Sequence, residues 1–159
     1  MHVRCGLHCA RVALATIALC KRYGIRVIAE GGLMAGCVHE DFVGVPCPGH
    51  GADAADPAVS SLPGLAEVTH TFGGWQGVQA ALKTLKRVAD KHGVSMRAVA
   101  LRWQMDLGAT PVVAVDWSDP GGAVGKATEE GAAAPDAALF QRASFLDEED
   151  MEALQGLYK

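Results

Sequence analysis

The chain has 159 residues and a mass of 16.6 kDa, a length that suits one domain. A complete eight-unit α/β barrel is excluded, because that fold takes about 250 residues and at least about 200. Half of the residues are hydrophobic and 20% are charged, which is typical of a globular chain rather than a disordered one. The net charge of −4 counts against a nucleic-acid partner. No apolar run reaches the ~18 residues of a membrane span, so we expect no membrane partner.

The five cysteines form an odd set without the spacing of a disulfide framework. We therefore expect reduced thiols and a cytoplasmic protein. Cysteines and histidines gather in two stretches, but neither stretch has the paired C-x₂-C spacing of a zinc site. We assign no metal site and interpret these side chains as incidental thiols and surface histidines. They are His2, Cys5, His8 and Cys9 in the first stretch, and Cys37, His39, Cys47 and His50 in the second.

The N-terminal segment has two interpretations. No acidic residue precedes Glu30, and arginines precede an apolar stretch over 12–20, an outline that a targeting segment also has. We favour an ordinary helix over residues 9–22, because Gly24 follows its expected end and cationic side chains occupy its last turn. A targeting segment is the alternative.

A buried parallel strand is predicted over residues 25–29, which are β-branched and nearly all apolar. The glycine-rich turn at 30–36 follows it, at the end of the strand where α/β folds bind ligands. Residues 44–73 contain four prolines and several glycines, and we predict a long irregular loop there.

Helical spacing begins at Trp75 and continues until Gly93. Ser95 is the expected N-cap of a second helix, which ends before Gly108. Apolar faces of these helices carry Trp75 and Trp103, and we expect both to pack in the core. A second buried strand is predicted over 112–115.

Residues 118–138 are rich in glycine and alanine and are predicted to form a second long loop. Asp147 is the expected N-cap of a last helix, and the acidic run that follows it suits the positive end of a helix. We interpret His92 as a cation at a helix end. Helices that alternate with two or three parallel strands give a mostly helical α/β fold.

Several segments together resemble the C-terminal half of the aldo-keto reductase barrel, over roughly residues 17–117 and 143–157. The segment 20–29 resembles the run into the seventh barrel strand, and Gly31, Leu33, Ala35 and Gly36 match the turn after it. The resemblance continues through 73–76, 82–86, 89–95, 99–103 and the closing helix at 144–150. It implies an incomplete (β/α)₈ barrel of TIM type, built from C-terminal βα units, with residues 1–159 as one partial domain.

The resemblance also implies NADP or NAD as cofactor and a small carbonyl compound as substrate. The family's catalytic tyrosine, lysine, aspartate and histidine belong to the first half of its barrel. Tyr23 and Tyr158 lie in no matching context, so no catalytic residue is assigned. The resemblance places cofactor contacts in the turn and after the second strand, at Glu30, Gly31, Gly32, Leu33, Gly36, Trp117 and Ser118.

Two departures count against cofactor binding, and against NADP more than NAD. Glu30 stands where the family commonly has an aromatic ring that stacks on nicotinamide, and a carboxylate cannot stack in this way. Asp116 lies where the family binds the adenosine phosphate, and its charge would repel a 2′-phosphate.

We therefore expect an aldo-keto reductase-like domain that is inactive as this chain. The alternative is a non-catalytic interaction or regulatory remnant. It would associate with itself, with a complementary barrel half or with a full-length reductase.

Overall fold

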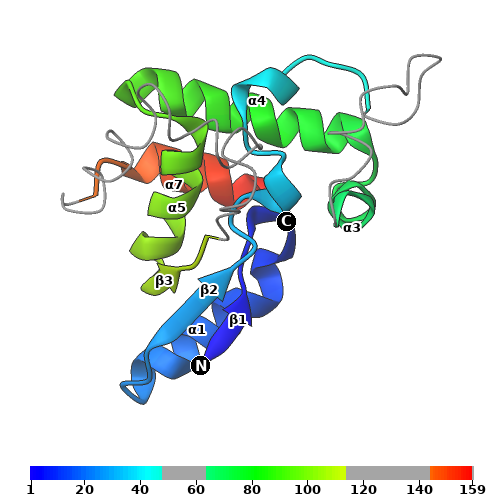
Figure 1. Ribbon diagram of the computed structural model, residues 1–159. Helices are drawn as coiled ribbons and strands as arrows, with labels where there is room; N and C mark the ends of the chain where they lie inside the picture. The colour runs from blue at the N-terminus through cyan, green and yellow to red at the C-terminus, as the bar shows by residue number, and fades with distance from the viewer. Residues whose placement is uncertain (48–63, 114–143, 159) are drawn as a thin grey trace, which may run out of the picture.

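The computed structural model describes residues 1–47, 64–113 and 144–158. Three short strands form a parallel sheet in the order β1 (His2–Arg4), β2 (Val27–Glu30) and β3 (Ala109–Pro111) (Figure 1). Helix α1 (Ala10–Arg22) connects β1 to β2, and helices α3 (Leu65–Thr71), α4 (Trp75–His92) and α5 (Met96–Asp106) precede β3. The predicted α/β class with parallel strands is confirmed, and the arrangement is consistent with an incomplete barrel.

One face of the sheet packs on the helices and the other is exposed. Val27, Ala29 and Ala109 are buried, with 2%, 0% and 6% of their surface exposed. Side chains alternate along a strand, so the residues between them lie on the opposite face, where Ile28 is 43% exposed. The exposed sheet face consists of His2, Arg4, Ile28, Glu30 and Thr110, and the exposed Val112 follows β3 directly.

Helix α1 confirms the helix predicted over 9–22. Its buried residues recur at three- and four-residue spacing, which directs one stripe of the helix toward the sheet. Gly24, with φ of +66°, takes the left-handed conformation that lets the chain turn back into β2. The N-terminal segment is thereby fixed against the core through Ala10, Ala13, Ile17 and Cys20.

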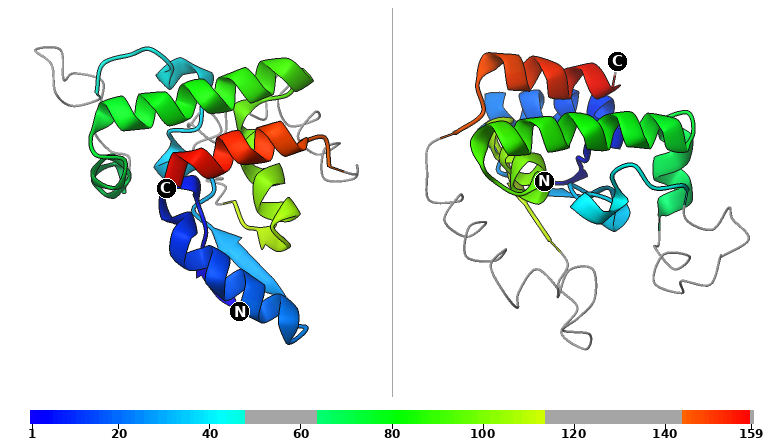
Figure 2. Two further views of the ribbon diagram at one scale, coloured as in Figure 1. Left: turned by 180° about the vertical axis from the view of Figure 1, so that it is seen from behind. Right: turned by 90° about the horizontal axis from the view of Figure 1, so that it is seen from above.

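The other helices form the core on the buried side of the sheet. The Ser95 side chain caps α5 by accepting a hydrogen bond from the Ala98 N–H at 3.0 Å, as the sequence predicts. Helix α7 (Glu148–Gln155) lies beside α4 (Figure 2). Trp103 is 1% exposed at the centre of the core, and Trp75 is half-buried. No helix in the described ranges is both long and apolar enough to cross a bilayer.

Three predicted boundaries differ from the structure. The first strand lies at 27–30 rather than 25–29. The described strand in this region is β3 at 109–111, which ends before the predicted start at 112, and residues 114 and 115 of the predicted strand lie outside the described ranges. The last residue of β3 is a proline, which is tolerated there because β3 is an edge strand of the sheet as far as the structure describes it. The predicted loop at 44–73 contains helix α3, whose apolar spacing was obscured by the prolines before it, and residues 48–63 of this prediction lie outside the described residues. The predicted loop at 118–138 lies outside the described residues.

Gly77 in the first turn of α4 gives a test of this packing. A Cβ at this position would overlap the backbone carbonyl oxygen of Phe72. Alanine normally stabilises a helix by about 0.5–1 kcal/mol over glycine, but here we expect Gly77→Ala to destabilise the protein by about 1–3 kcal/mol through overpacking. Urea denaturation followed by circular dichroism measures this. The control is Gly156→Ala, whose Cβ would meet no atom of the described residues within 4 Å. Equal stability of both variants would contradict the packing.

Candidate functional site

The glycine-rich turn after β2 has an unusual backbone. Gly31 and Gly36 have φ of +81° and +87°, and two non-glycine residues between them, Met34 and Ala35, also have positive φ, at +49° and +56°. This left-handed conformation costs an L-residue roughly 1–2 kcal/mol. The Met34 side chain is fully buried and holds the turn against the core. Strain of this kind at the carboxyl end of a parallel strand is typical of ligand-binding turns.

A pocket of about 450 Å³ lies at the carboxyl ends of β1 and β2. It brings two of the predicted cofactor residues, Glu30 and Gly31, together with Arg4 and His8. The other predicted residues of the turn, Gly32, Leu33 and Gly36, are not among the residues that line it. Gly32 faces the side chain of Gln104, and Leu33 packs on the core. Trp117 and Ser118 lie outside the described residues.

The charges around this pocket are mostly paired. The Arg4 guanidinium donates two hydrogen bonds to the Glu67 carboxylate, at 3.0 and 3.1 Å, which raises the pKa of Arg4. The Glu30 carboxylate lies 3.4 Å from the Nε2 atom of His2. One guanidinium therefore faces two carboxylates, an arrangement that favours neutral or cationic groups over the phosphates of a dinucleotide.

His8 is buried and is not the surface histidine predicted from the sequence. Its side chain is enclosed, the residue is 5% exposed, and neither ring nitrogen has a hydrogen-bond partner among the described residues. Burial lowers the pKa of His8, so the ring is neutral at pH 7 and offers one donor and one acceptor. Sequence reasoning missed this environment because β1, which places His8 beside the turn, was not predicted.

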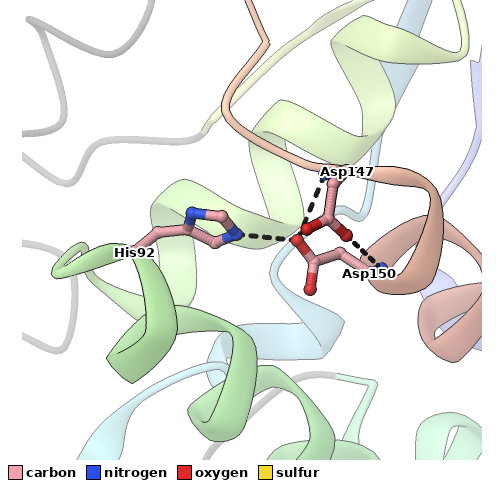
Figure 3. Close-up of side chains that lie close together, drawn as sticks. All are labelled: His92, Asp147 and Asp150. Atoms are coloured by element: carbon pink, nitrogen blue, oxygen red, sulfur yellow. Dashed lines mark hydrogen bonds and ion pairs between the residues drawn. The ribbon is translucent and has the colours of Figure 1, made fainter.

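A second cluster joins the C-terminal end of α4 to the start of α7 (Figure 3). The Nε2 atom of His92 lies 2.7 Å from the Asp150 carboxylate. The Lys91 ammonium donates to Asp150 at 2.9 Å and to Asp147 at 2.6 Å. Asp147 and Asp150 also form a reciprocal capping box at the helix start, which confirms the predicted N-cap. The cluster therefore connects two helices that are far apart in the sequence.

The charges of this cluster stabilise the contact between α4 and α7, and we call the cluster the α4–α7 clamp. Burial by itself would raise the pKa of Asp150, but hydrogen bonds from His92, Lys91 and the Asp147 N–H lower it to about 2. The hydrogen bond from Lys91 also lowers the pKa of Asp147. His92, Asp147 and Asp150 offer ligand atoms within 4.8 Å of one another, but the Lys91 ammonium already supplies the positive charge between the carboxylates.

The two stretches of cysteines and histidines noted in the sequence contribute no residue to the cluster of His92, Asp147 and Asp150. In the described part of the chain, Cys5, Cys9, Cys20 and Cys37 are free thiols. Burial raises the pKa of Cys5 and of Cys37 to about 11, so both are protonated at neutral pH. His50 lies outside the described residues. The absence of a metal site therefore stays a prediction.

Parallel strands joined by helices, with a pocket and a strained glycine-rich turn at their carboxyl ends, define an α/β protein of the barrel-forming kind. Residues 6–120 match the model of the aldo/keto reductase family. The chain belongs to this family, and the resemblance predicted from the sequence is confirmed. The match begins at residue 6, whereas the resemblance noted in the sequence began near residue 17, and it ends before helix α7.

The chain is also similar to flagellar radial spoke protein 5 of Chlamydomonas reinhardtii. The two are 42% identical over 154 residues, which cover 92% of this chain and 29% of the relative. The chain therefore spans less than a third of the length of that relative.

Proposed function

We propose that this chain has a non-catalytic role and assembles with other protein through its exposed sheet face. This proposal is supported mainly by the exposed face and by the open edges of the sheet. Within the described part of the chain, β1 and β3 each pair with β2 alone. Open strand edges offer unpaired backbone donors and acceptors to another strand. The exposed Ile28 and Val112 add apolar surface beside these edges.

The chemistry of the pocket supports this proposal over carbonyl reduction. Family members reduce a carbonyl with a hydride from the cofactor and a proton from a tyrosine supported by lysine. The described lining of the 450 Å³ pocket includes neither tyrosine nor lysine. The family resemblance implies that Glu30 stands where an aromatic ring commonly stacks on nicotinamide, and a carboxylate cannot stack in this way. The relative is named as a protein of the flagellar radial spoke, which supports a role in an assembly.

Binding to a defined probe tests the proposal. The probe is Chlamydomonas reinhardtii radial spoke protein 5 from which the region aligned with this chain has been deleted, here called the spoke probe. We expect the full chain to bind it with a dissociation constant of about 1 µM or below by isothermal titration calorimetry. Ile28→Asp is expected to weaken binding at least about tenfold. Val45→Asp, an exposed apolar residue away from the sheet, is the matched control.

Binding of a nicotinamide dinucleotide is the second candidate function, favoured by the strained turn beside the pocket. Fluorescence titration with NADH and NADPH measures it, followed by carbonyl-dependent oxidation of the cofactor. We expect no saturation with either cofactor. Saturable binding with turnover, together with no binding to the spoke probe, would replace the assembly role with a reductase role.

A further inference from the structure

The turn between α1 and β2 lies at the amino ends of the parallel strands (Figure 1), opposite to the pocket at their carboxyl ends. Every residue of this turn is exposed, and we call residues 21–26 the basic turn. It consists of Lys21, Arg22, Tyr23, Gly24, Ile25 and Arg26. A further strand beside β1 or β3 would extend the sheet sideways and leave the amino end of β2 open.

Two backbone hydrogen bonds fix the basic turn. The N–H of Ile25 donates to the carbonyl oxygen of Cys20 at 2.9 Å, and the N–H of Gly24 donates to that of Lys21 at 3.2 Å. Together with the left-handed Gly24, these bonds form the Schellman arrangement that ends many helices. A backbone fixed in this way loses little conformational freedom when a partner binds. The side chains of the basic turn therefore form a preorganised surface.

Two large apolar side chains of the basic turn face solvent. Tyr23 is 68% exposed and Ile25 is 49% exposed. In a Schellman turn, an apolar residue at the position of Ile25 frequently packs back on the helix, but here about half of it stays accessible. Aromatic side chains are enriched at the centres of protein interfaces. Tyr23 and Ile25 therefore offer a contact for an apolar side chain of a partner.

The cations of the basic turn form no ion pair with an acidic residue of 1–47, 64–113 or 144–158. This applies to Lys21, Arg22 and Arg26. Five other cations are paired with carboxylates in the same ranges, namely Arg4, Lys86, Arg87, Lys91 and Arg102. The basic turn is therefore a local excess of positive charge on a chain whose net charge is −4.

The end of a helix explains only part of this charge. Lys21 and Arg22 occupy the last turn of α1, where the helix dipole favours cations. Arg26 lies four residues beyond the helix end, where the dipole effect has fallen off. The Lys21 side chain lies against Gly108, because a Cβ there would overlap its Cε atom. The helix end also gives no reason for the exposure of Tyr23 and Ile25.

These features favour an acidic peptide over other anionic partners. Lipid-binding clusters have about four to eight cations, whereas the basic turn has three. The net charge of −4 counts against nucleic acid. An acidic segment that also carries an apolar residue complements both the cations and the exposed pair of Tyr23 and Ile25.

We infer that the basic turn binds an acidic segment of a partner protein. Carboxylates of that segment pair with Arg22 and Arg26, and an apolar side chain of it packs on Tyr23 and Ile25. This binding site goes beyond the assembly role proposed above, because it uses the amino end of the sheet rather than its exposed face. The two surfaces can therefore be tested independently.

A synthetic peptide tests the site by fluorescence anisotropy with the full chain. The probe is a fluorescein-labelled peptide in which glutamates flank a leucine and a phenylalanine, and the matched probe has glutamine in place of each glutamate. At low ionic strength we expect the glutamate peptide to bind at least about tenfold more tightly than the glutamine peptide. Added salt should weaken this binding. No binding of the glutamate peptide, or equal binding of both peptides, overturns the inference.

Two double variants of equal net charge locate the contact. Arg22→Glu with Arg26→Glu reverses cations of the basic turn. Lys83→Glu with Arg97→Glu reverses cations of α4 and α5 that also form no ion pair within the described ranges. We expect the first variant to bind the glutamate peptide at least about tenfold more weakly and the second to bind as the wild-type chain does. Equal losses would assign the attraction to net charge and overturn the site.

Tyr23→Ser tests the apolar part of the contact without a change of charge. Because Tyr23 is exposed, we expect its replacement to leave the urea stability unchanged. Binding of the glutamate peptide should nevertheless become severalfold weaker. Unchanged binding contradicts the packing of an apolar side chain on the basic turn. This variant keeps the inference testable if circular dichroism shows that the charge-reversal variant does not fold.

Two further measurements separate the alternatives. Vesicles that contain phosphatidylserine replace the peptide in the first, and binding to vesicles without binding to the peptide would assign the basic turn to a membrane surface instead. The second uses the spoke probe. A wild-type chain that binds the spoke probe but not the glutamate peptide keeps the proposed assembly role and overturns the acidic-peptide site.

Discussion

Replacing Trp103 with alanine is expected to cost about 3–5 kcal/mol of unfolding free energy, the largest effect of any single substitution considered. Trp103 is 1% exposed and belongs to the central core cluster. Its ring lies 6.0 Å from that of Tyr158, so it also supports the C-terminal turn. The cavity left by alanine cannot close, because helices and sheet surround it. Urea denaturation monitored by circular dichroism measures the loss.

Trp103→Phe is the informative control for this position. The Nε1 atom of Trp103 is buried and has no hydrogen-bond partner within the ranges that the structure describes. Phenylalanine removes that N–H while it keeps most of the apolar volume. We expect Trp103→Phe to retain most of the stability that Trp103→Ala loses. Equal losses in the two variants would mean that the indole N–H, rather than the packing volume, stabilises the core.

Asp150→Ala is expected to destabilise the protein by about 3 kcal/mol. Asp150 is 1% exposed and accepts hydrogen bonds from His92, Lys91 and the Asp147 N–H. Its removal leaves His92 without this partner, leaves Lys91 with Asp147 as its remaining hydrogen-bonded carboxylate, and opens the capping box of α7. Because this carboxylate connects the two helices, α7 is expected to lose amide protection in hydrogen exchange before the sheet does. Asp41→Asn, at a largely exposed carboxylate, is the control.

The same cluster makes stability depend on pH in acid. The pKa of Asp150 in the folded protein is about 2, below the ordinary value of 3.8, and that of Asp147 is lowered too. The stabilisation is therefore complete above about pH 4 and is lost as pH falls from 3.8 towards 2, where the folded carboxylate also becomes protonated. Asp150→Ala should flatten this part of the profile. A wild-type profile that is flat between pH 4 and 2 would contradict the clamp.

Local signals predicted the helices well. Gly24 and Gly93 mark the ends of α1 and α4, and the caps at Ser95 and Asp147 were identified from their side chains. Strand β1 was missed because three residues with a polar–apolar–polar pattern carry too little signal. Helix α3 was missed because proline and glycine dominate the composition of the segment that precedes it.

The candidate sites depend on contacts that sequence spacing cannot predict. The turn at 30–36 was identified because its glycines and the strand before it are local features. By contrast, Arg4 and Glu67 are 63 positions apart, and His92 and Asp150 are 58 apart. The interpretations of His92 as a helix-end cation and of the acidic run as a helix start were correct locally. Only tertiary packing brings the two ends together and buries Asp150 between them.

The pairing of the strands has a consequence for the order of folding. Val3 pairs with Ala29 across 26 positions of chain, whereas Val27 pairs with Ala109 across 82. Closing the longer loop costs more chain entropy, and distant pairings slow folding. The β1–α1–β2 unit is therefore expected to form early, and β3 to join only after α4 and α5 have packed. Until then the second edge of β2 stays open, so newly made chains pass through a state that pairs readily with other strands.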